Sequence, residues 1–427
     1  MKKNEGPTPQ GLSAKQNMIW NTFGSVVNLA SQWLITILIV RLSNGFNAAG
    51  LYSLASSIYA IFAPLGQYRM RVYQISDVEG ENTLGEYMVL RLLTSNVALV
   101  LCVIYSILTC SGNDILAIFL YGLYKTAMLL IEVLHACDQQ HYRMDYIGQS
   151  MALQGIGSLA AFCVVFIITG SLEFSLAAMT SVVVLIGVTI DLPRTTRFEH
   201  IKLKISFSKA KHLLIRCFPI AVAGIAVNAA PSIPRQLLAS ISGTEALGVY
   251  ASIAAPIAII QMGATYIYDP LLSYFSDSFH EGRIRDFVIL LGKALLGIAC
   301  VGIVAIIGII LFAKPVVGLL YGAKSVEYSY LMIPMVPLAV STGLMWFVND
   351  LLAAVREFRG TFVGGAVSLI SALFVMRPMI ETFDMNGVTY TGIVSCVLSL
   401  VVMSTFLVLR LQDRARARTT GSARGRS

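Results

Sequence analysis

The sequence predicts an all-α integral membrane protein with about twelve transmembrane helices, arranged in two six-helix lobes related by a parallel pseudo-two-fold repeat. Of the 427 residues, 56% are hydrophobic and only 13% are charged, whereas soluble domains carry about 25% charged residues. Apolar runs of the length that a helical crossing needs, about 20 residues, recur along the whole chain. One apolar sequence segment also occurs twice, in similar form, about half a chain length apart.

Twelve apolar runs are each long enough to cross a bilayer. In chain order they cover 18–40, 47–66, 88–110, 114–134, 149–169, 173–192, 213–240, 247–272, 288–313, 329–354, 360–380 and 388–410. With the N-terminus in the cytoplasm, 25 of the 31 Lys and Arg residues lie on the inner side. Basic residues near the membrane concentrate on the cytoplasmic side, so we expect a multi-pass protein of the cell membrane with both termini cytoplasmic.

These runs and the basic segments between them predict five parts of the chain. The net charge of +8 needs no nucleic-acid partner, because topology and anionic membrane lipids explain the basic segments. The parts are a cytoplasmic N-terminus (1–17), an N-terminal six-helix lobe (18–192), a basic cytoplasmic linker (193–212), a C-terminal six-helix lobe (213–410) and a disordered basic cytoplasmic tail (411–427).

The repeated phrase indicates how the lobes are related. "NGFNAAGLYSLASSIYAIF" (44–62) and "SGTEALGVYASIAAPIAII" (242–260) are 198 positions apart, and "YRMDYIG" (142–148) echoes "FRGTFVG" (358–364) at an offset of 216. Six crossings separate the two long copies, and an even number means that both copies run in the same direction. This is a parallel repeat about an axis along the membrane normal, which favours an alternating-access transporter.

Polar stripes on the first and seventh spans mark equivalent helices of the two lobes. Residues spaced three or four apart share one face of a helix. Such stripes either join packed helices or line a cavity, and their presence on both equivalent helices favours the cavity. Two prolines, Pro231 and Pro234, are expected to interrupt the seventh span and free carbonyl groups towards that cavity. The stripes consist of Asn21, Ser25, Asn28 and Gln32 in the first span, and of Asn228, Ser232 and Arg235 in the seventh.

The fourth span carries a lysine near the middle of the membrane. Asp114, Tyr121, Lys125 and Glu132 share one face of this helix, and Lys125 lies roughly 16 Å from the outer end. A cation at that depth costs at least about 2.5–3.5 kcal/mol and needs compensation. Lys125 therefore either pairs with an acid from another helix or faces water and takes up an anion.

Four apolar segments carry a family resemblance. "NMIWNTFGSVVNLASQWLITILIVR", "AGLYSLASSI", "YQISD" and "LLYGAKSVEYSYLMIP" resemble polysaccharide flippases of the multidrug/oligosaccharidyl-lipid/polysaccharide exporter superfamily. The resemblance implies that the chain moves undecaprenyl-pyrophosphate-linked oligosaccharide from the inner to the outer leaflet for surface polysaccharide biosynthesis. It also implies a polysaccharide polymerase and assembly proteins as partners. The pyrophosphate would be the anion for Lys125.

The resemblance and the charges together define candidate sites. Lys125, Arg235 and Arg41 would supply positive charge to a cavity that Tyr121 and Glu132 also line. At the cytoplasmic ends of the spans, Arg71 and Asp269 align at the offset of 198 and could form a gate between the lobes; solvated helix ends are the alternative. A drug or organic-cation exporter of the same superfamily remains the alternative function, since Glu132, Asp269 and Asp350 could form acidic walls.

Enzyme chemistry is not expected. His135, Asp138, His141 and Asp145 could suggest a metal site or an acyltransferase, but they lie at a cytoplasmic helix end, where polar residues are ordinary. No glycine-rich loop of Walker type is present, and no predicted loop is large enough to form a catalytic domain. The sequence therefore predicts no catalytic residue, no metal and no cofactor.

Overall fold

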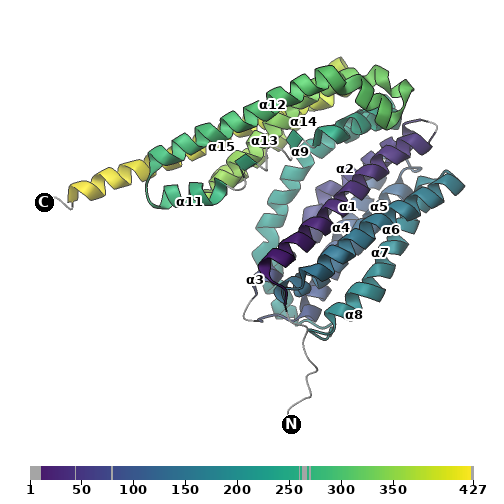
Figure 1. Cartoon of the computed structure of the whole chain (residues 1–427), viewed down its shortest axis with the longest axis horizontal. Helices are drawn as coiled ribbons and strands as arrows, with labels where there is room; N and C mark the ends of the chain where they lie inside the picture. Colours follow the sequence, from purple (N-terminus) through teal and green to yellow (C-terminus); the bar gives the residue numbers. More distant parts are fainter. Residues whose placement is uncertain are drawn as a thin grey trace, which may run out of the picture. The chain divides into compact units, whose positions relative to one another are not determined.

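The computed structural model describes residues 11–43, 45–77, 80–258, 260–261, 267–268 and 271–424, which form helices and short connections with no strand among them (Figure 1). Within this part of the chain, eleven helices are long and apolar enough to cross a membrane. The chain is thus an all-helical, multi-pass membrane protein. It forms two compact units, one up to Ile225 and one from Ala226 onward.

The first unit is a bundle whose helix ends carry ordinary capping signals. Ser13 and Thr83 each begin a helix with a capping box, which satisfies free backbone N–H groups, and Gly170 ends one in the left-handed conformation. Its helices are α1 (Ala14–Leu42), α2 (Asn47–Gln67), α3 (Met70–Ser76), α4 (Leu84–Thr109), α5 (Ile115–Gln140), α6 (Met144–Thr169), α7 (Leu172–Ile186), the π-helical turn η1 (Gly187–Asp191) and α8 (Leu192–Thr195).

The second unit contains the remaining helices, three of which (α9, α12 and α15) exceed the length of a single membrane crossing. They are α9 (Phe207–Ala254), the 3₁₀ turn η2 (Ala255–Ile257), α11 (Leu272–His280), α12 (Ile284–Tyr321), the 3₁₀ segment η4 (Ala323–Leu331), α13 (Met332–Ala354), α14 (Phe358–Phe383) and α15 (Met385–Arg424). The start of α9 belongs to the first unit.

The boundary between the units lies inside α9 rather than in the expected linker at 193–212. Leu213, Cys217 and Ala221 are buried against the first unit in a cluster that includes Tyr68 and Leu90. These three residues are spaced by four and form one stripe of the helix. The hydroxyl of Tyr68 also donates to the carbonyl of Leu214 at 3.0 Å. About the first four turns of α9, up to Ala221, therefore pack with the N-terminal unit.

The seventh predicted span and the start of the eighth both lie within α9, and the chain leaves helical geometry between them. The helix continues through Pro231 and Pro234 and breaks only at Gly243, where φ is 89°. A proline loses one backbone hydrogen bond and can be held in a bent helix, whereas a positive φ suits glycine. Gly243 aligns with Gly45, which lies in the connection between the first two spans. Part of the predicted span 247–272 lies outside the described residues.

Each unit pairs its helices in the same order, which supports an internal repeat. In the first unit α4 packs on α5, α5 on α7 and α6 on α7. In the second unit α12 packs on α13, α13 on α15 and α14 on α15. Each pair in the second unit occupies the same place in chain order as its counterpart in the first. The repeat predicted from short sequence echoes thus has a parallel in helix packing.

The corners after α5 and α13 share one turn and correct the register of the second echo. Tyr142 and Arg356 both have a φ of 57°. The amide of the following residue, Arg143 or Glu357, donates to a carbonyl five residues earlier, at 2.9 and 2.8 Å. The two turns are 214 positions apart (356 − 142), not 216. The sequence echo pairs Tyr142, which precedes α6, with Phe358, which is the first residue of α14. The echo is therefore misaligned by two residues.

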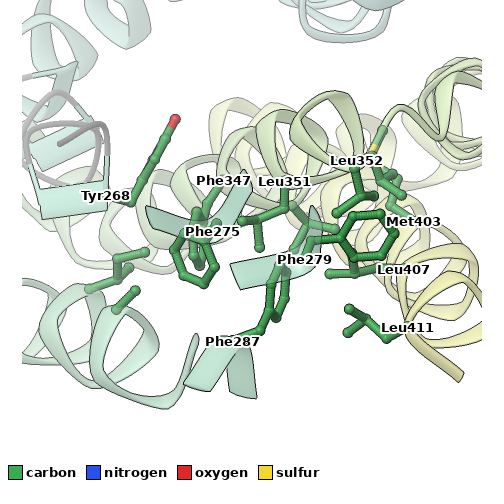
Figure 2. Close-up of a cluster of buried hydrophobic side chains, with 14 residues drawn as sticks. Tyr268, Phe275, Phe279, Phe287, Phe347, Leu351, Leu352, Met403, Leu407 and Leu411 are labelled. Carbon is green, nitrogen blue, oxygen red and sulfur yellow. The ribbon is translucent and has the colours of Figure 1, made fainter. Parts of the chain in front are cut away.

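An aromatic core holds α11, α12, α13 and α15 together in the second unit. Figure 2 shows Phe275 next to both Phe347 and Phe287, its ring tilted against the first and edge-on to the second, with Leu411 at the edge of the same cluster. Arg414 donates to the carbonyl of His280 at 2.6 Å. The tail was expected to be disordered from residue 411, but α15 continues as a helix because these two side chains are anchored on α11.

Replacing Phe347 with alanine tests this core. The side chain is fully buried, and removing a buried phenylalanine costs about 3–5 kcal/mol. We expect Phe347→Ala to lower the thermal unfolding temperature of the purified protein strongly. Phe374→Ala is the matched control because Phe374 is 80% exposed on α14, and it should leave the unfolding temperature nearly unchanged. Equal shifts for the two variants would contradict the assigned core.

Candidate functional site

Lys125 lies in the middle of α5 without a carboxylate partner. It is ten residues after Ile115, about 15 Å along the helix at ~1.5 Å per residue, and it is half-buried. Its Nζ donates to Oε1 of Gln32 at 3.3 Å and lies 5.6 and 5.3 Å from the ring centres of Tyr121 and Tyr124. Within the described residues no acidic side chain forms an ion pair with it. The sequence left two alternatives for Lys125, an ion pair with an acid from another helix or a position open to an anion. The ion pair is not found within the described residues.

Gln32 is oriented towards Lys125 by a relay of side-chain amides. Nε2 of Gln32 donates to Oδ1 of Asn28, and Nδ2 of Asn28 donates to the carbonyl of Met151 on α6 at 3.0 Å. Because both NH₂ groups are used in this way, each amide oxygen points onward along the relay. Gln32 therefore presents a fixed acceptor to the ammonium group. The sequence stripe on the first span correctly groups Asn28 and Gln32, but their link to Lys125 follows only from the structure.

Close packing of α1 on α6 makes this relay possible. A Cβ atom on Gly24 would lie 2.4 Å from the carbonyl oxygen of Gly148, and one on Gly155 would lie 2.8 Å from Cα of Asn28. Small residues let two membrane helices approach backbone to backbone. The short side chain of Asn28 can then reach the α6 carbonyl of Met151. The glycines thus set the position of the amide arm beside Lys125.

Aromatic rings hold α5 against α2 next to the lysine. The ring of Tyr121 lies edge-on to those of Tyr52 and Tyr59, with centroids 5.3 and 6.1 Å apart. Tyr121 is buried, so it acts as packing and as one of two rings near the Lys125 cation. A cation over an aromatic ring gains about 0.5–2 kcal/mol. This contact offsets part, but not all, of the cost of a cation at this depth.

Glu132 is neutralised by two arginines and is not a free acid. Arg91 on α4 is 0% exposed and donates to Oε2 of Glu132 at 3.1 Å. Arg71 on α3 lies 3.5 Å from Oε1 of the same carboxylate. Arg91 also donates to the carbonyls of Gly66 and Gln67 at 3.0 and 2.7 Å, which are free at the end of α2. This network joins four helices.

The network changes two interpretations made from the sequence. Glu132 was a candidate cavity residue, and it instead supports the bundle. Arg71 was a candidate gate partner of Asp269; it bonds Glu132 and also Gln139, at 3.3 Å, while Asp269 lies outside the described residues. Sequence reasoning placed Arg91 near a helix end and missed its role. The available signal was a lone arginine in the third span opposite a lone glutamate in the fourth.

In the second unit, Arg235 is a half-buried cation on α9. It lies close enough to the buried Tyr250 to interact electrostatically, and within the described residues no carboxylate forms an ion pair with it. On the same helix, Ser232 is buried and Asn228 is half-buried with a partner of its own. In the first unit, Arg41 is exposed in the last turn of α1, where a cation complements the negative end of the helix dipole.

The polar residues near the end of α5 separate into different environments. Asp145 forms two hydrogen bonds with Arg143, at 2.9 and 2.8 Å, and His141 stacks on Phe198. Hydrogen bonding to Asp145 raises the pKa of the Arg143 guanidinium. His135 and Asp138 turn inward and are buried. Within the described residues, no group of three or more His, Cys, Asp or Glu side chains is arranged to hold a metal ion.

Comparisons with known proteins give the fold a name. No family model matches the sequence. The capsular polysaccharide biosynthesis protein CapF of Staphylococcus aureus is 20% identical over 394 residues, which cover 90% of this chain and 97% of CapF. The solved structure of the lipid II flippase MurJ in an inward closed conformation matches with a TM-score of 0.71 at 10% identity, covering 94% of this chain and 90% of MurJ.

Transporters of the multidrug resistance MATE family match as well. An inward-facing MATE transporter of the MOP superfamily has a TM-score of 0.61 at 13% identity, covering 95% of this chain and 96% of its own. The chain therefore has the fold of the MOP superfamily transporters, as its sequence resemblance predicts.

A double-mutant cycle tests the pairing of Arg91 with Glu132. Removing one member of a buried charge pair costs about 3–5 kcal/mol because the other charge stays buried without a partner. We expect Arg91→Gln to lower the thermal stability strongly, and Glu132→Gln to cost less when Arg91 is already replaced. The exposed pair Arg377–Glu381 is the control, and its coupling should stay below about 0.5 kcal/mol. Additive effects at Arg91 and Glu132 would disprove the pairing.

Proposed function

We propose that this chain, a multi-pass membrane protein with the MOP transporter fold, is a flippase for polyprenyl-pyrophosphate-linked oligosaccharide. It carries this substrate from the cytoplasmic to the outer leaflet by alternating access, for surface polysaccharide biosynthesis. The whole-length similarity to CapF, a capsular polysaccharide biosynthesis protein, and the structural similarity to MurJ, a lipid II flippase, support the proposal. The observation that carries it is the unpaired cation Lys125.

The surroundings of Lys125 suit an anionic headgroup. The ammonium has one amide acceptor and two aromatic rings, and within the described residues it has no carboxylate. A phosphate oxygen would supply the missing charge, with a contact of roughly 1.5–3 kcal/mol. Lysine binds phosphate as a point charge and tolerates different approach directions. An organic cation would instead be repelled at this position.

The acids that kept an organic-cation exporter as the alternative are less available than the sequence suggests. Two arginines neutralise Glu132, and Asp350 accepts a hydrogen bond from the hydroxyl of Tyr268 at 3.1 Å. The similarity to MATE transporters still makes an organic cation the competing substrate. Lys125 argues against it.

We also propose that the repeat gives the substrate a second contact. Arg235 belongs to the seventh predicted span, the counterpart of the first, and Ser232 and Asn228 continue its polar stripe. Arg41 would add positive charge towards the outer side. Alternating access would then carry the headgroup outward while the prenyl tail stays in lipid.

Loss of Lys125 should stop export. In a strain that lacks the gene, we expect lipid-linked units to accumulate on the cytoplasmic leaflet, and wild-type protein to restore surface glycan. Lys125→Ala and Arg235→Ala should insert normally but fail to restore it, because losing one charge-assisted contact weakens binding about tenfold to a hundredfold. Lys125→Arg should keep partial function.

Lys314→Ala is the matched control for this experiment, because Lys314 is an exposed cation on α12. It should restore export fully. If Lys125→Ala and Arg235→Ala restore export while Asp350→Asn abolishes it, the transported species is a cation, and the organic-cation exporter is the better assignment. Absence of lipid-linked units in the null strain would show that the protein builds glycan instead of moving it.

The proposed orientation, with both termini cytoplasmic, can be tested by cysteine labelling in a variant without native cysteines. A membrane-impermeant reagent should label Gly112→Cys and Lys324→Cys in intact cells. It should label Lys204→Cys only after permeabilisation, because basic segments stay on the cytoplasmic side. A side chain at position 112 meets no atom within 4 Å, so this substitution should not disturb the fold. Labelling of Lys204→Cys in intact cells would show that the orientation is the opposite of the one proposed.

A further inference from the structure

Three ionisable side chains are buried together one to two turns of α5 beyond Glu132. His135 and Asp138 come from α5, and Asp191 is the last residue of η1. Asp138 and Asp191 are 0% exposed and His135 is 6% exposed. Nε2 of His135 lies 3.5 Å from Oδ1 of Asp191. We name these three residues the His–Asp cluster.

One oxygen of each aspartate in the His–Asp cluster accepts a hydrogen bond. Ser150 donates to Oδ2 of Asp191 at 2.8 Å, and Thr195 donates to Oδ1 of Asp138 at 3.1 Å. The other oxygen of each carboxylate, together with Nε2 of His135, is buried and has no hydrogen bond in the structure. Buried polar atoms without partners are rare and require an explanation. Here three of them belong to one cluster.

The local sequence explains why Asp191 reaches α5. Pro193 has no backbone N–H, and its ring would clash with the carbonyl of Thr189, four residues earlier. The helix widens at this point into the π-helical turn η1, a feature that often occurs at functional sites. Gly187 at the start of η1 leaves room for Ile131 of α5, since a Cβ there would lie 2.9 Å from that side chain. The turn therefore carries Asp191 into the space next to His135.

The charges around the cluster leave one negative charge uncompensated. Asp138 interacts electrostatically with His135, Asp191 and Arg194, and the Arg194 guanidinium also lies over the ring of Tyr146, 4.9 Å from its centre. Three other arginines on the packed helices are already paired: Arg143 with Asp145, and Arg71 and Arg91 with Glu132. Two carboxylates thus face one arginine.

A single bound proton makes this site neutral. Burial and a neighbouring like charge both oppose ionisation of two carboxylates in one site. A proton held on one of the two aspartate carboxyls would also supply a donor to the unpartnered atoms. A metal ion is a poorer occupant, because within the described residues no group of three or more ligands is arranged to hold one.

We propose that the His–Asp cluster is a proton-binding site of the N-terminal unit, occupied at neutral pH. The site itself is independent of the substrate. Its role, which rests on the proposed transport function, is to couple substrate movement to a proton gradient: the neutral cluster lets α5 and η1 stay packed, and loss of the proton leaves a charge that favours their separation and hydration.

Infrared spectroscopy of the purified full-length protein in lipid nanodiscs tests the proton site directly. At neutral pH the wild type should show the C=O band of a buried carboxylic acid, and aspartate labelled with carbon-13 in the side-chain carboxyl should shift that band. Asp138→Asn and Asp191→Asn should each remove it. Glu132→Gln is the control and should leave the band in place. A wild type without the band, or unchanged bands in both aspartate variants, would overturn the proposal.

Two further outcomes separate the binding site from its role. Added sodium at constant pH should leave the band unchanged, and displacement of the proton by sodium would show that the site binds a metal cation instead. In proteoliposomes, an imposed pH gradient should stimulate wild-type translocation at least about fivefold, the scale of ordinary coupling between sites, and Asp138→Asn should lose this response. A gradient-insensitive wild type would overturn the coupling role, whereas absence of any translocation would overturn the proposed substrate.

Discussion

The arrangement of the N-terminal unit depends on one constraint, which is that charges inside a membrane bundle must be satisfied by the protein itself. Arg91 shows how this is done: it is 0% exposed, caps the end of α2 through the carbonyls of Gly66 and Gln67, and pairs with Glu132, while its Nε has no hydrogen-bond partner in the structure. With Arg71 on α3, this network ties α2, α3, α4 and α5 together. Lys125 on α5 differs from Arg91. Its ammonium group contacts the side-chain amide of Gln32 and two aromatic rings, and no acidic side chain within the described residues pairs with it.

Helix α5 carries three different charge environments at successive depths, and each suits a different task. Lys125 offers an incomplete site to an anion, Glu132 locks the bundle, and the His–Asp cluster holds charge in balance near the end of the helix. About 10 Å of helix separates Lys125 from Glu132 at ~1.5 Å per residue. Because all three lie on one helix, a movement of α5 that follows a change of protonation would also move the amide and aromatic contacts of Lys125. This arrangement links the proposed proton site to the proposed substrate site.

The sequence was sufficient for the class of protein and for nearly all of the crossings, because these depend on apolar length, and the predicted internal repeat is supported by the similar helix pairing in the two units. It also grouped Asn28 with Gln32 and singled out Lys125, since helical spacing alone determines which residues share a face. It could not assign the partners of Glu132, because Arg91 and Arg71 reach it only through helix packing. The same holds for Asp191, whose position depends on the π-helical turn before Pro193. The tail was expected to be disordered from residue 411, and the helical start of this segment could not be predicted for a related reason. Leu411 packs into the aromatic core and Arg414 bonds to the carbonyl of His280 on α11, and both contacts are remote in sequence.

The central claim is that Lys125 binds the anionic headgroup of a lipid-linked substrate, and direct binding to purified protein tests it most closely. Native mass spectrometry can compare undecaprenyl pyrophosphate with a lipid-like quaternary ammonium compound on the wild type, Lys125→Ala and Lys314→Ala. The account predicts that the wild type and Lys314→Ala prefer the pyrophosphate lipid, and that Lys125→Ala binds it about tenfold to a hundredfold more weakly. Equal binding of the pyrophosphate lipid by the wild type and Lys125→Ala, or a preference of the wild type for the ammonium compound, would contradict it.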